Sequence, residues 1–248
     1  MSRDWDAATY DRVSGPQVGW AGPVVDRLAL RGDETVLDAG CGSGRVTLML
    51  LERLPRGRVL AVDGSESMVR HAREALGRRA TVLHADLLEL ELDEPVDVVF
   101  SNAVFHWVPD HDLLFRRLHR ALRPGGRLVA QCGGDGNLER FLRAAAEVAA
   151  EEPFARHLAG WHEPLNFAAP RETAKRLEAA GFAGVDTWLE PRPVTPDDPE
   201  SFIRTVCLAP HVDRLPEDLR GGYLAAVCRV APAELDYVRL NIVARRPR

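Results

Sequence analysis

The segment best suited to hold a small ligand is Val36-Leu37-Asp38-Ala39-Gly40-Cys41-Gly42-Ser43-Gly44. Its apolar start predicts a buried strand, and its dense glycines predict a tight turn that opens a helix. Glycine suits such a turn because it adopts positive φ without strain and lets a ligand approach the backbone closely. We expect Gly40, Cys41 and Gly42 to contact a ligand. A dinucleotide loop of the G-x-G-x-x-G type and a plain tight turn are the alternatives.

Three aspartates follow three successive predicted strands. Asp38 is placed to attract an ammonium group rather than a pyrophosphate. Asp63 follows Val59-Leu60-Ala61-Val62, where a carboxylate accepts hydrogen bonds from two ribose hydroxyls, a feature that NAD sites share. Asp86 follows the third strand and is placed to accept from an adenine amino group. Carboxyl ends of parallel strands share one rim, so we expect all three carboxylates to line one nucleoside site.

Strand-like and helix-like runs alternate along most of the chain. Strands are predicted over 35–39, 58–62, 80–84, 96–101, 127–131, 185–189 and 237–244. Helices are predicted over 46–51, 68–76, 112–122, 137–151, 171–180, 200–207 and 216–229. This order indicates an α/β fold: a doubly wound, mostly parallel seven-stranded sheet with helices on both faces and a helical lid or cap formed by insertions.

The same alternation predicts a division of the chain. Residues 1–33 would form N-terminal lid helices, 34–136 the Rossmann-like core, 137–170 a cap insertion, and 171–248 the rest of the core with a second cap insertion at 199–232. Pro124-Gly125-Gly126 reads as a turn that ends one helix before the fifth strand. In the last strand Val238, Leu240 and Ile242 alternate with Arg239 and Asn241, which predicts one wetter face.

Bulk properties exclude several classes of partner. A net charge of −5 disfavours nucleic acid, whose binding depends on many cationic contacts. No apolar run approaches the roughly 20 residues of a membrane-spanning helix, and no apolar signal core follows the first basic residue, so we expect a cytoplasmic protein without membrane contact. The 4 cysteines contain no C-x-x-C pair, so neither a disulfide framework nor a metal site is expected. A monomer and a homodimer both stay open.

The glycine turn and the aspartates together carry a resemblance. The run from Asp38 to Gly44 resembles the first motif of the Rossmann-like (class I) S-adenosylmethionine-dependent methyltransferases, and Asp63-Gly64-Ser65-Glu66-Ser67-Met68 resembles their D-x-S-x-x-M segment. The resemblance implies S-adenosylmethionine as cofactor and S-adenosylhomocysteine as product, with Gly40, Cys41 and Gly42 at the methionine portion. It further implies that Asp63, with Gly64 and Ser65, holds the ribose, that Met68 packs on adenine, and that Asp86 and Leu87 flank it.

The end of the fourth predicted strand, Ser101-Asn102-Ala103-Val104-Phe105-His106-Trp107, lies where this fold places groups facing the sulfonium and the acceptor. We expect Asn102 at the cofactor. His106 is the candidate catalytic base, and an acceptor ligand or a core histidine are its alternatives. The segment is not of the D/N-P-P-Y/F type, which again disfavours a nucleic-acid substrate. From the N-terminal segment, Tyr10 and Gln17 are expected to fold over the cofactor.

A closer resemblance covers most of the chain. The Trp5 to Tyr10 opening, Ser101-Asn102-Ala103 with Trp107-Val108-Pro109-Asp110-His111, Val129-Ala130-Gln131 and the ending from Arg239 to Arg245 are similar to trans-aconitate 2-methyltransferases. It implies esterification of a carboxylate on a small organic acid. Ala209 stands where the family suggests an arginine, so a guanidinium fork for a tricarboxylate is missing.

The acceptor site is predicted from the two insertions and the N-terminal segment. Its candidate residues are Arg12, Trp107, Trp161, His162, Arg204 and His211. The alternatives to esterification are O- or C-methylation of a natural product or another metabolite, with N-methylation also open. Rival functions are a nicotinamide-dependent oxidoreductase and a nucleotide-binding regulatory protein without turnover.

Overall fold

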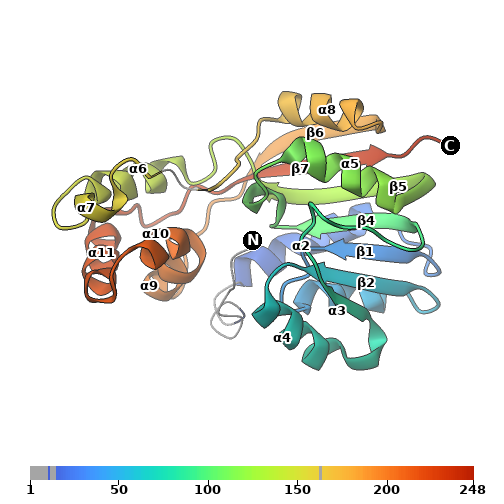
Figure 1. Cartoon of the computed structure of the whole chain (residues 1–248), viewed down its shortest axis with the longest axis horizontal. Helices are drawn as coiled ribbons and strands as arrows, with labels where there is room; N and C mark the ends of the chain where they lie inside the picture. The colour runs from blue at the N-terminus through green and yellow to red at the C-terminus, as the bar shows by residue number, and fades with distance from the viewer. Residues whose placement is uncertain (1–10, 12–14, 162–163) are drawn as a thin grey trace.

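Seven strands of the described chain form one sheet, in the order β3-β2-β1-β4-β5-β7-β6. The computed structural model describes residues 11, 15–161 and 164–248 (Figure 1). The strands are β1 (Thr35–Ala39), β2 (Arg58–Asp63), β3 (Thr81–His84), β4 (Val96–Asn102), β5 (Leu122–Gly133), β6 (Ala183–Pro191) and β7 (Val238–Arg245). Strands β1 to β5 run parallel, and β7 runs antiparallel to both of its neighbours. The predicted doubly wound sheet is therefore confirmed.

The strands β1 and β4 are neighbours in the sheet although β2 and β3 come between them in the sequence. From β1 the chain adds β2 and β3 toward one edge of the sheet, and it then returns to add β4 and β5 on the other side of β1. Val36 of β1 pairs with Val98 of β4, and Asp38 pairs with Phe100. In an open α/β sheet, the loops beyond the carboxyl ends of two such strands diverge and leave a crevice for a ligand. The fold thus places the glycine turn after β1 directly beside the segment that follows β4.

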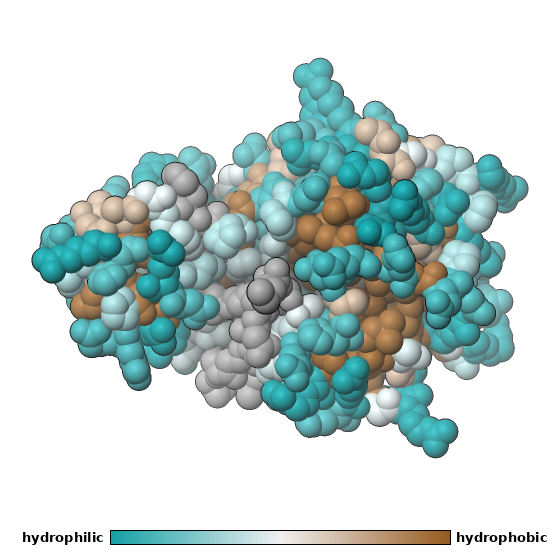
Figure 2. All heavy atoms as spheres, viewed as in Figure 1, coloured by the Kyte–Doolittle hydropathy of each residue, from teal (hydrophilic) through white to brown (hydrophobic). Residues whose placement is uncertain are grey.

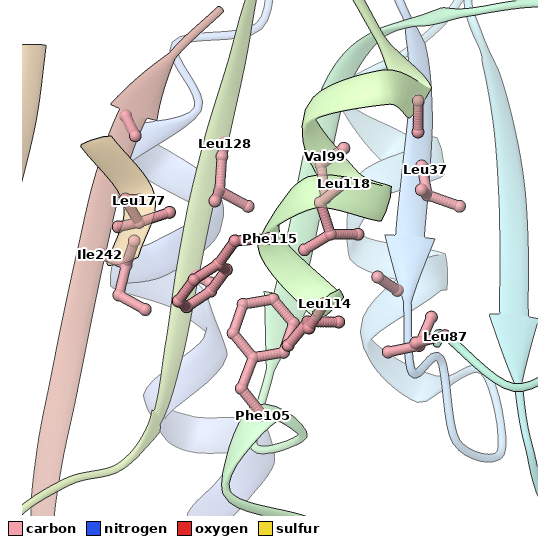
Figure 3. Close-up of a cluster of buried hydrophobic side chains, with 14 of the residues drawn as sticks. Leu37, Leu87, Val99, Phe105, Leu114, Phe115, Leu118, Leu128, Leu177 and Ile242 are labelled. Carbon is pink, nitrogen blue, oxygen red and sulfur yellow. The ribbon is translucent and has the colours of Figure 1, made fainter. Parts of the chain in front are cut away.

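Helices cover both faces of the sheet. Successive side chains of a strand point to opposite faces, and in the central strands those on both faces are apolar. On one face Val36, Val98 and Phe100 pack with α2 and α3, and a neighbouring cluster packs with α4. On the other face Leu37, Val99 and Leu128 pack with α5 and α8 (Figure 3). The helices concerned are α2 (Gly15–Arg27), α3 (Arg45–Glu52), α4 (Glu66–Leu76), α5 (His111–Ala121) and α8 (Pro170–Ala179). Buried strands of this kind read as continuous apolar runs.

The fifth strand begins earlier than the sequence predicts. Helix α5 ends at Ala121 and β5 starts at Leu122, so Pro124-Gly125-Gly126 lies inside the strand and does not stop the helix. Leu122 pairs with Val96, and the next pair joins Arg127 to Val98, so the intervening residues form an irregularity. Gly125 has φ of 79°, which an L side chain rarely adopts. The turn residues are therefore absorbed as a bulge within a longer strand.

A helical cap lies at one end of the sheet (Figure 1). It contains α6 (Glu139–Ala149), α7 (Ala155–Leu158), α9 (Pro199–Phe202), the π-helix η3 (Ile203–Cys207), α10 (Ala209–Arg214) and α11 (Glu217–Val230). Phe141, Phe202 and Tyr223 belong to a hydrophobic cluster of its own beneath these helices. Short 3₁₀ helices complete the chain at Gly77–Arg79 (η1) and Phe105–Trp107 (η2). Two segments far apart in the sequence thus share one core.

The prediction that one face of the last strand is exposed to solvent is wrong. Arg239 and Asn241 of β7 are buried, because α2 covers the face of the sheet to which they point. Asn241 Oδ1 accepts hydrogen bonds from Arg27 Nη1 of α2 (2.8 Å) and from Gln131 Nε2 of β5 (2.9 Å). The alternation in the sequence is real, but the polar face carries a buried hydrogen-bonded network in place of solvent.

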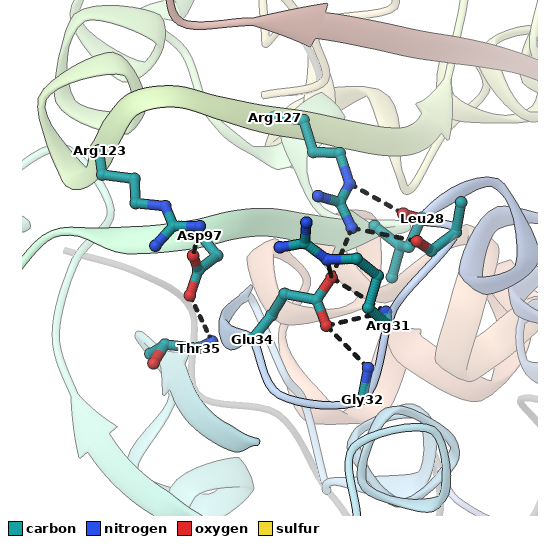
Figure 4. Close-up of polar contacts among 9 residues, drawn as sticks. Leu28, Arg31, Gly32, Glu34, Thr35, Asp97, Arg123 and Arg127 are labelled. Carbon is teal, nitrogen blue, oxygen red and sulfur yellow. Dashed lines mark hydrogen bonds and ion pairs between the residues drawn. The ribbon is translucent and has the colours of Figure 1, made fainter. Parts of the chain in front are cut away.

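At the opposite rim of the sheet, Glu34 ties together the amino ends of the strands (Figure 4). Its carboxylate accepts from the N–H groups of Arg31 and Gly32, each at 3.0 Å, and Arg127 Nη2 lies 3.2 Å away. Burial alone would raise the pKa of Glu34, but these hydrogen bonds lower it to about 2. The charged carboxylate therefore fixes the turn before β1.

Hydrophilic residues cover much of the visible surface, and hydrophobic residues gather over the half that carries the sheet (Figure 2). Among the helices that the structure describes, none combines the length and the apolar character needed to cross a bilayer.

Candidate functional site

A cavity of about 650 Å³ opens at the rim where β1 and β4 end. Its walls come from the loops after the parallel strands, from the cap, and from the start of β7. The part nearest the loops is lined by Asp38, Gly40, Cys41, Gly42, Ser43, Asp63, Gly64, Ser65, Met68, Asp86, Leu87 and Asn102. The part toward the cap includes His106, Trp107, Asn137, Leu138, Trp161, Leu165, Phe167, Val206, Tyr237 and Arg239. One cavity therefore has room for two ligands side by side.

The glycine turn holds its shape through conformations that other residues rarely adopt. Gly40 has φ of 84°, and a Cβ there would lie 2.3 Å from the Cγ2 atom of Val104. Gly42 has φ of 55°, and a Cβ there would meet nothing within 4 Å. Gly40 is thus required by packing against the segment after β4, whereas Gly42 leaves its backbone open to the cavity.

Asp63 fastens this turn to the start of α4. Its Oδ2 atom accepts a hydrogen bond from the N–H of Gly42 at 2.8 Å, and its Oδ1 atom accepts from the N–H of Ser65 at 2.9 Å. Ser65 in turn caps α4, because its Oγ accepts from the N–H of Met68 at 3.3 Å. Burial raises the pKa of Asp63. The carboxylate that faces the cavity also orders two of its walls.

Asp38 is a buried carboxylate at the floor of the cavity. Thr47 Oγ1 donates to its Oδ2 atom at 2.7 Å. Burial, together with the charge of the nearby Asp63, raises the pKa of Asp38 to about 7, although the hydrogen bond from Thr47 opposes the shift. Among the described residues, no arginine or lysine forms an ion pair with either carboxylate. A cationic ligand would supply the missing positive charge.

Asp86, Met68 and Leu87 complete the wall beyond Asp63. Met68 and Leu87 are buried, and both present apolar surface to the cavity. Asp86 Oδ1 accepts from the N–H of Leu88 at 3.0 Å, which fixes the turn after β3. A flat apolar group could lie between the two hydrophobic side chains, with a carboxylate at its edge. This chemistry, together with that of Asp38, fits a nucleoside that carries a positively charged amino-acid portion.

Ser43 and Arg45 connect the glycine turn to the N-terminal segment, a contact that sequence reasoning missed. Ser43 Oγ donates to Asp11 Oδ1, and Arg45 Nη1 donates to the backbone oxygen of Asp11 at 2.7 Å. Asp11 also lines the cavity. No pattern in the sequence marks Asp11, because it lies outside the βα units from which motifs are read.

His106 is held as a neutral imidazole beside the cavity. The N–H of Gly133 donates to His106 Nδ1 at 3.2 Å, so the ring proton of the neutral form sits on Nε2. Burial, the charge of Arg239 and the nearby His111 lower the pKa of His106 well below its usual value. With the Nδ1 lone pair engaged, this arrangement favours a hydrogen-bond donor over a general base.

Arg239 is the main residue of the cavity that sequence reasoning did not single out. Its side chain is 2 % exposed, its Nε atom donates to Gln131 Oε1 at 3.4 Å, and its guanidinium lies 4.7 Å from the ring centre of Trp20. Gly133 is paired with Arg239 across the sheet, so Arg239 comes close to His106. An arginine at an alternate position of a strand was the available signal, but its direction depended on how α2 packs.

The structure brings most of the predicted site residues together. All the predicted cofactor residues from Asp38 to Asn102 line the cavity, as do His106, Trp107 and Trp161. Tyr10, Arg12 and His162 lie outside the described residues, and Gln17 lies in α2 without a described side chain.

Two of the predicted acceptor residues do not reach the cavity. Arg204 is exposed on η3, and His211 is buried in the cap between Trp161 and Tyr223. His211 packs its ring at 4.7 Å from that of Trp161, and burial lowers its pKa to about 4. It therefore supports a cavity residue from behind. Ala209 is buried in α10 and adds no charge.

Comparison with known proteins agrees with this geometry. Residues 36–126 match a family model described as a methyltransferase domain. The chain is 34% identical over 225 residues to a trans-aconitate 2-methyltransferase of Variovorax paradoxus strain S110, covering 90% of this chain and 86% of the relative. It is 32% identical over 269 residues to a trans-aconitate 2-methyltransferase of Methylobacterium nodulans, covering 99% of both.

Solved structures share the fold at low sequence identity. The YcgJ protein from Bacillus subtilis has a TM-score of 0.65 and 16% identity, covering 92% of this chain and 98% of that chain. Haemonchus contortus phosphoethanolamine N-methyltransferase 2, solved with phosphomonomethylethanolamine and S-adenosylhomocysteine, has a TM-score of 0.63 and 19% identity, covering 98% of this chain and 57% of that one. Because its relatives match it over most of its length and its sheet has the topology of this fold, the chain belongs to the trans-aconitate 2-methyltransferase family of class I S-adenosylmethionine-dependent methyltransferases.

Proposed function

We propose that this enzyme methylates a carboxylate oxygen of a small organic acid. The observation that carries the proposal is Arg239, a buried guanidinium on the wall of the cavity toward the cap. A guanidinium in this setting binds a carboxylate through charge-assisted hydrogen bonds. The aspartates at the ends of β1 to β3 would hold the methyl donor. The names of the relatives, trans-aconitate 2-methyltransferases, support an acid as the acceptor.

The chemistry asks little of a catalytic base. When bound, S-adenosylmethionine supplies an electrophilic methyl group on a positively charged sulfur. An acceptor carboxylate is already ionised near neutral pH, because ordinary carboxyl pKa values lie around 4. Transfer would form a bond between this oxygen and the methyl carbon while the carbon–sulfur bond breaks and leaves its electron pair on sulfur, which would give an ester and S-adenosylhomocysteine. The contribution of the protein is alignment and exclusion of water.

His106 would help to align the acceptor. The N–H of Gly133 occupies Nδ1, so Nε2 carries the proton and can donate to the carboxylate oxygen that does not react. The Phe167 ring stacks on His106 at 5.9 Å and holds it in place. We further propose that the segments 137–170 and 199–232 act as caps over the acceptor. The predicted lid of residues 1–33 is corrected for its second half, because Val24, Val25 and Leu28 at α2 pack into the core on one face of the sheet.

The test of this function is a methyl-transfer assay with labelled S-adenosylmethionine and a panel of carboxylic acids, phenols and amines. We expect label in a product that alkaline hydrolysis releases as methanol, because a methyl ester is alkali-labile. Products from phenols and amines resist this hydrolysis and serve as the contrast. Transfer to phenols or amines without transfer to any acid would contradict the proposal.

Binding of S-adenosylhomocysteine is expected to strengthen as pH rises from 6 to 8. Burial raises the pKa of Asp38 to about 7 in the free protein, so below that pH the site must lose a proton before the carboxylate can pair with the ammonium group of the ligand. The limiting slope is about tenfold in affinity per pH unit.

Titration calorimetry in buffers of different ionisation enthalpy checks this dependence, because the proton released on binding changes the measured heat. Asp38→Asn should bind weakly at every pH and lose the slope. Tight binding by Asp38→Asn, or an unchanged slope, would assign the proton to another group.

A further inference from the structure

We propose that Gln131 and Asn241 are positioning residues: they hold the guanidinium of Arg239 in one orientation at the cavity and thereby set the affinity for the acceptor. The inference rests on the function proposed above, in which Arg239 binds the acceptor carboxylate. Gln131 and Asn241 are buried, and neither lines the cavity, so neither contacts the acceptor. Their effect on the reaction must pass through Arg239.

The three side chains share one face of the sheet. Gln131 of β5 pairs directly with Asn241 of β7, and Arg239 lies two residues before Asn241 on the same strand. Directly paired side chains point to the same face, and so do side chains two residues apart on one strand. This is the face that α2 covers, and at most 2 % of each of the three residues is exposed.

Hydrogen bonds join the three side chains in a chain. Asn241 Oδ1 accepts from Gln131 Nε2 at 2.9 Å, and Gln131 Oε1 accepts from Arg239 Nε at 3.4 Å. Gln131 therefore uses one end of its amide toward Asn241 and the other toward Arg239. Because the two ends differ in hydrogen-bonding character, this pattern fixes which way the amide is turned.

Charged groups at the outer end give the chain its direction. Arg27 Nη1 donates to Asn241 Oδ1 at 2.8 Å, and Asn241 Nδ2 donates to Glu190 Oε2 at 3.3 Å. A guanidinium has only donors and a carboxylate only acceptors, so turning the amide of Asn241 over would break both bonds. The oxygen of Asn241 then requires the Nε2 end of Gln131, which leaves the Oε1 end for Arg239.

Helix α2 holds both ends of this chain. Arg27 and Trp20 are 7 residues apart in the sequence, close to two turns, so they lie on the same face of the helix. The guanidinium of Arg27 lies 5.0 Å from the ring centre of Trp188, and its Nη2 atom is 3.9 Å from Glu190 Oε2. At the inner end, the ring centre of Trp20 is 4.7 Å from the guanidinium of Arg239.

The contact with Gln131 orients Arg239 without cancelling its charge, because the amide is neutral. A two-pronged contact between a guanidinium and a carboxylate requires the planar fork to face its partner. A guanidinium that already has this orientation loses less conformational entropy when the acceptor binds. The network should therefore lower KM for the acceptor and have little effect on the transfer step itself.

Gln131→Met removes the amide and keeps an unbranched side chain of similar length. We expect KM to rise about tenfold, while kcat and the affinity for S-adenosylhomocysteine stay within about threefold, because Arg239 keeps its charge and loses its fixed orientation. Initial-rate kinetics and titration calorimetry measure these values. The acceptor is the acid methylated fastest in the panel described above, with trans-aconitate, cinnamate and octanoate among its members.

Two further variants frame this result. Asn241→Leu acts one step farther from the cavity and should raise KM by about threefold. Thr173→Val is the matched control, since it removes a buried polar group from α8, away from the cavity, and should leave KM unchanged. Thermal unfolding shows whether each variant is folded.

A double-mutant cycle separates positioning from packing. If Gln131 acts through Arg239, then Gln131→Met combined with Arg239→Gln should have a kcat/KM within about threefold of Arg239→Gln alone, since no guanidinium is left to orient. Independent effects would multiply and lower kcat/KM by about a further tenfold. If Gln131→Met does not fold, the same cycle is run with Asn241→Leu and judged by whether its effect multiplies.

The outcomes distinguish this inference from the function on which it rests. Effects that multiply, or an unchanged KM in Gln131→Met, would overturn the positioning role and leave acceptor binding by Arg239 standing. Unimpaired methylation of the acid by Arg239→Gln, or methylation of no acid by the unchanged protein, would overturn the proposed function and this inference with it.

Discussion

Asp63→Ala is expected to weaken the binding of S-adenosylhomocysteine by at least about 100-fold, since a charge-assisted hydrogen bond contributes roughly 1.5–3 kcal/mol and several are lost together. The carboxylate binds the N–H groups of Gly42 and Ser65, and it lines the cavity where we place the ribose. The variant therefore loses a ligand contact and releases the glycine turn from α4. Titration calorimetry measures the affinity.

Two further variants calibrate that result. Asp86→Ala should weaken binding less, by about tenfold, because Asp86 fixes only its own turn through the N–H of Leu88. Asp93→Ala, at an exposed position between β3 and β4, should bind as tightly as the unchanged protein. Thermal unfolding of each variant shows whether a loss of affinity reflects a loss of fold. Unchanged affinity in both the Asp63 and the Asp86 variant would refute the placement of the nucleoside.

Arg239→Gln is expected to lower kcat/KM for an acid acceptor by about 100-fold, chiefly through KM, while the affinity for S-adenosylhomocysteine stays within about threefold. The reason is that the acceptor carboxylate would be buried without its counter-charge. The guanidinium also lies on the ring of Trp20 and donates to Gln131, so some loss of thermal stability should accompany the change. Initial-rate kinetics with a saturating methyl donor separates KM from kcat.

Arg239→Lys and Arg229→Gln complete this experiment. Lysine keeps the charge but not the planar fork, so we expect an intermediate KM. Arg229 is exposed on α11, and its substitution should change neither constant. A fall in donor affinity with an unchanged acceptor KM in Arg239→Gln would place the guanidinium at the donor, and the proposed acceptor site would have to move.

Sequence reasoning grouped the residues of the proposed donor site because each part of that site is local in the sequence. The strand at Thr35–Ala39, the glycine turn and the acids after β1 to β3 are each specified by residues within one βα unit. Parallel pairing then brings their carboxyl ends to one rim without further information. That explains why the residues from Asp38 to Asn102 that were predicted for the cofactor all line the cavity.

The proposed acceptor site was harder to predict because tertiary packing decides which residues line it. Arg239 and Asn241 alternate with apolar residues, and only the position of α2 over β7 shows that this polar face is buried. Arg204 and His211 belong to the right cap, but their positions on its helices turn one to solvent and the other into the cap core. The segment Pro124-Gly125-Gly126 was predicted as a turn before the fifth strand. It lies inside β5 instead, because the residues on both sides of it pair with β4.

The reversed direction of β7 has a consequence for how this enzyme can diversify. A parallel strand presents its last residues at the rim of the sheet where the cavity lies, whereas the antiparallel β7 presents its first residues there. Arg239, near the C-terminus of the chain, therefore lies at this rim. If the proposed sites are right, the first half of the chain carries most of the donor site and the second half most of the acceptor site. Chimeras that exchange residues 137–248 between relatives should transfer substrate preference as a module and leave the methyl donor unchanged.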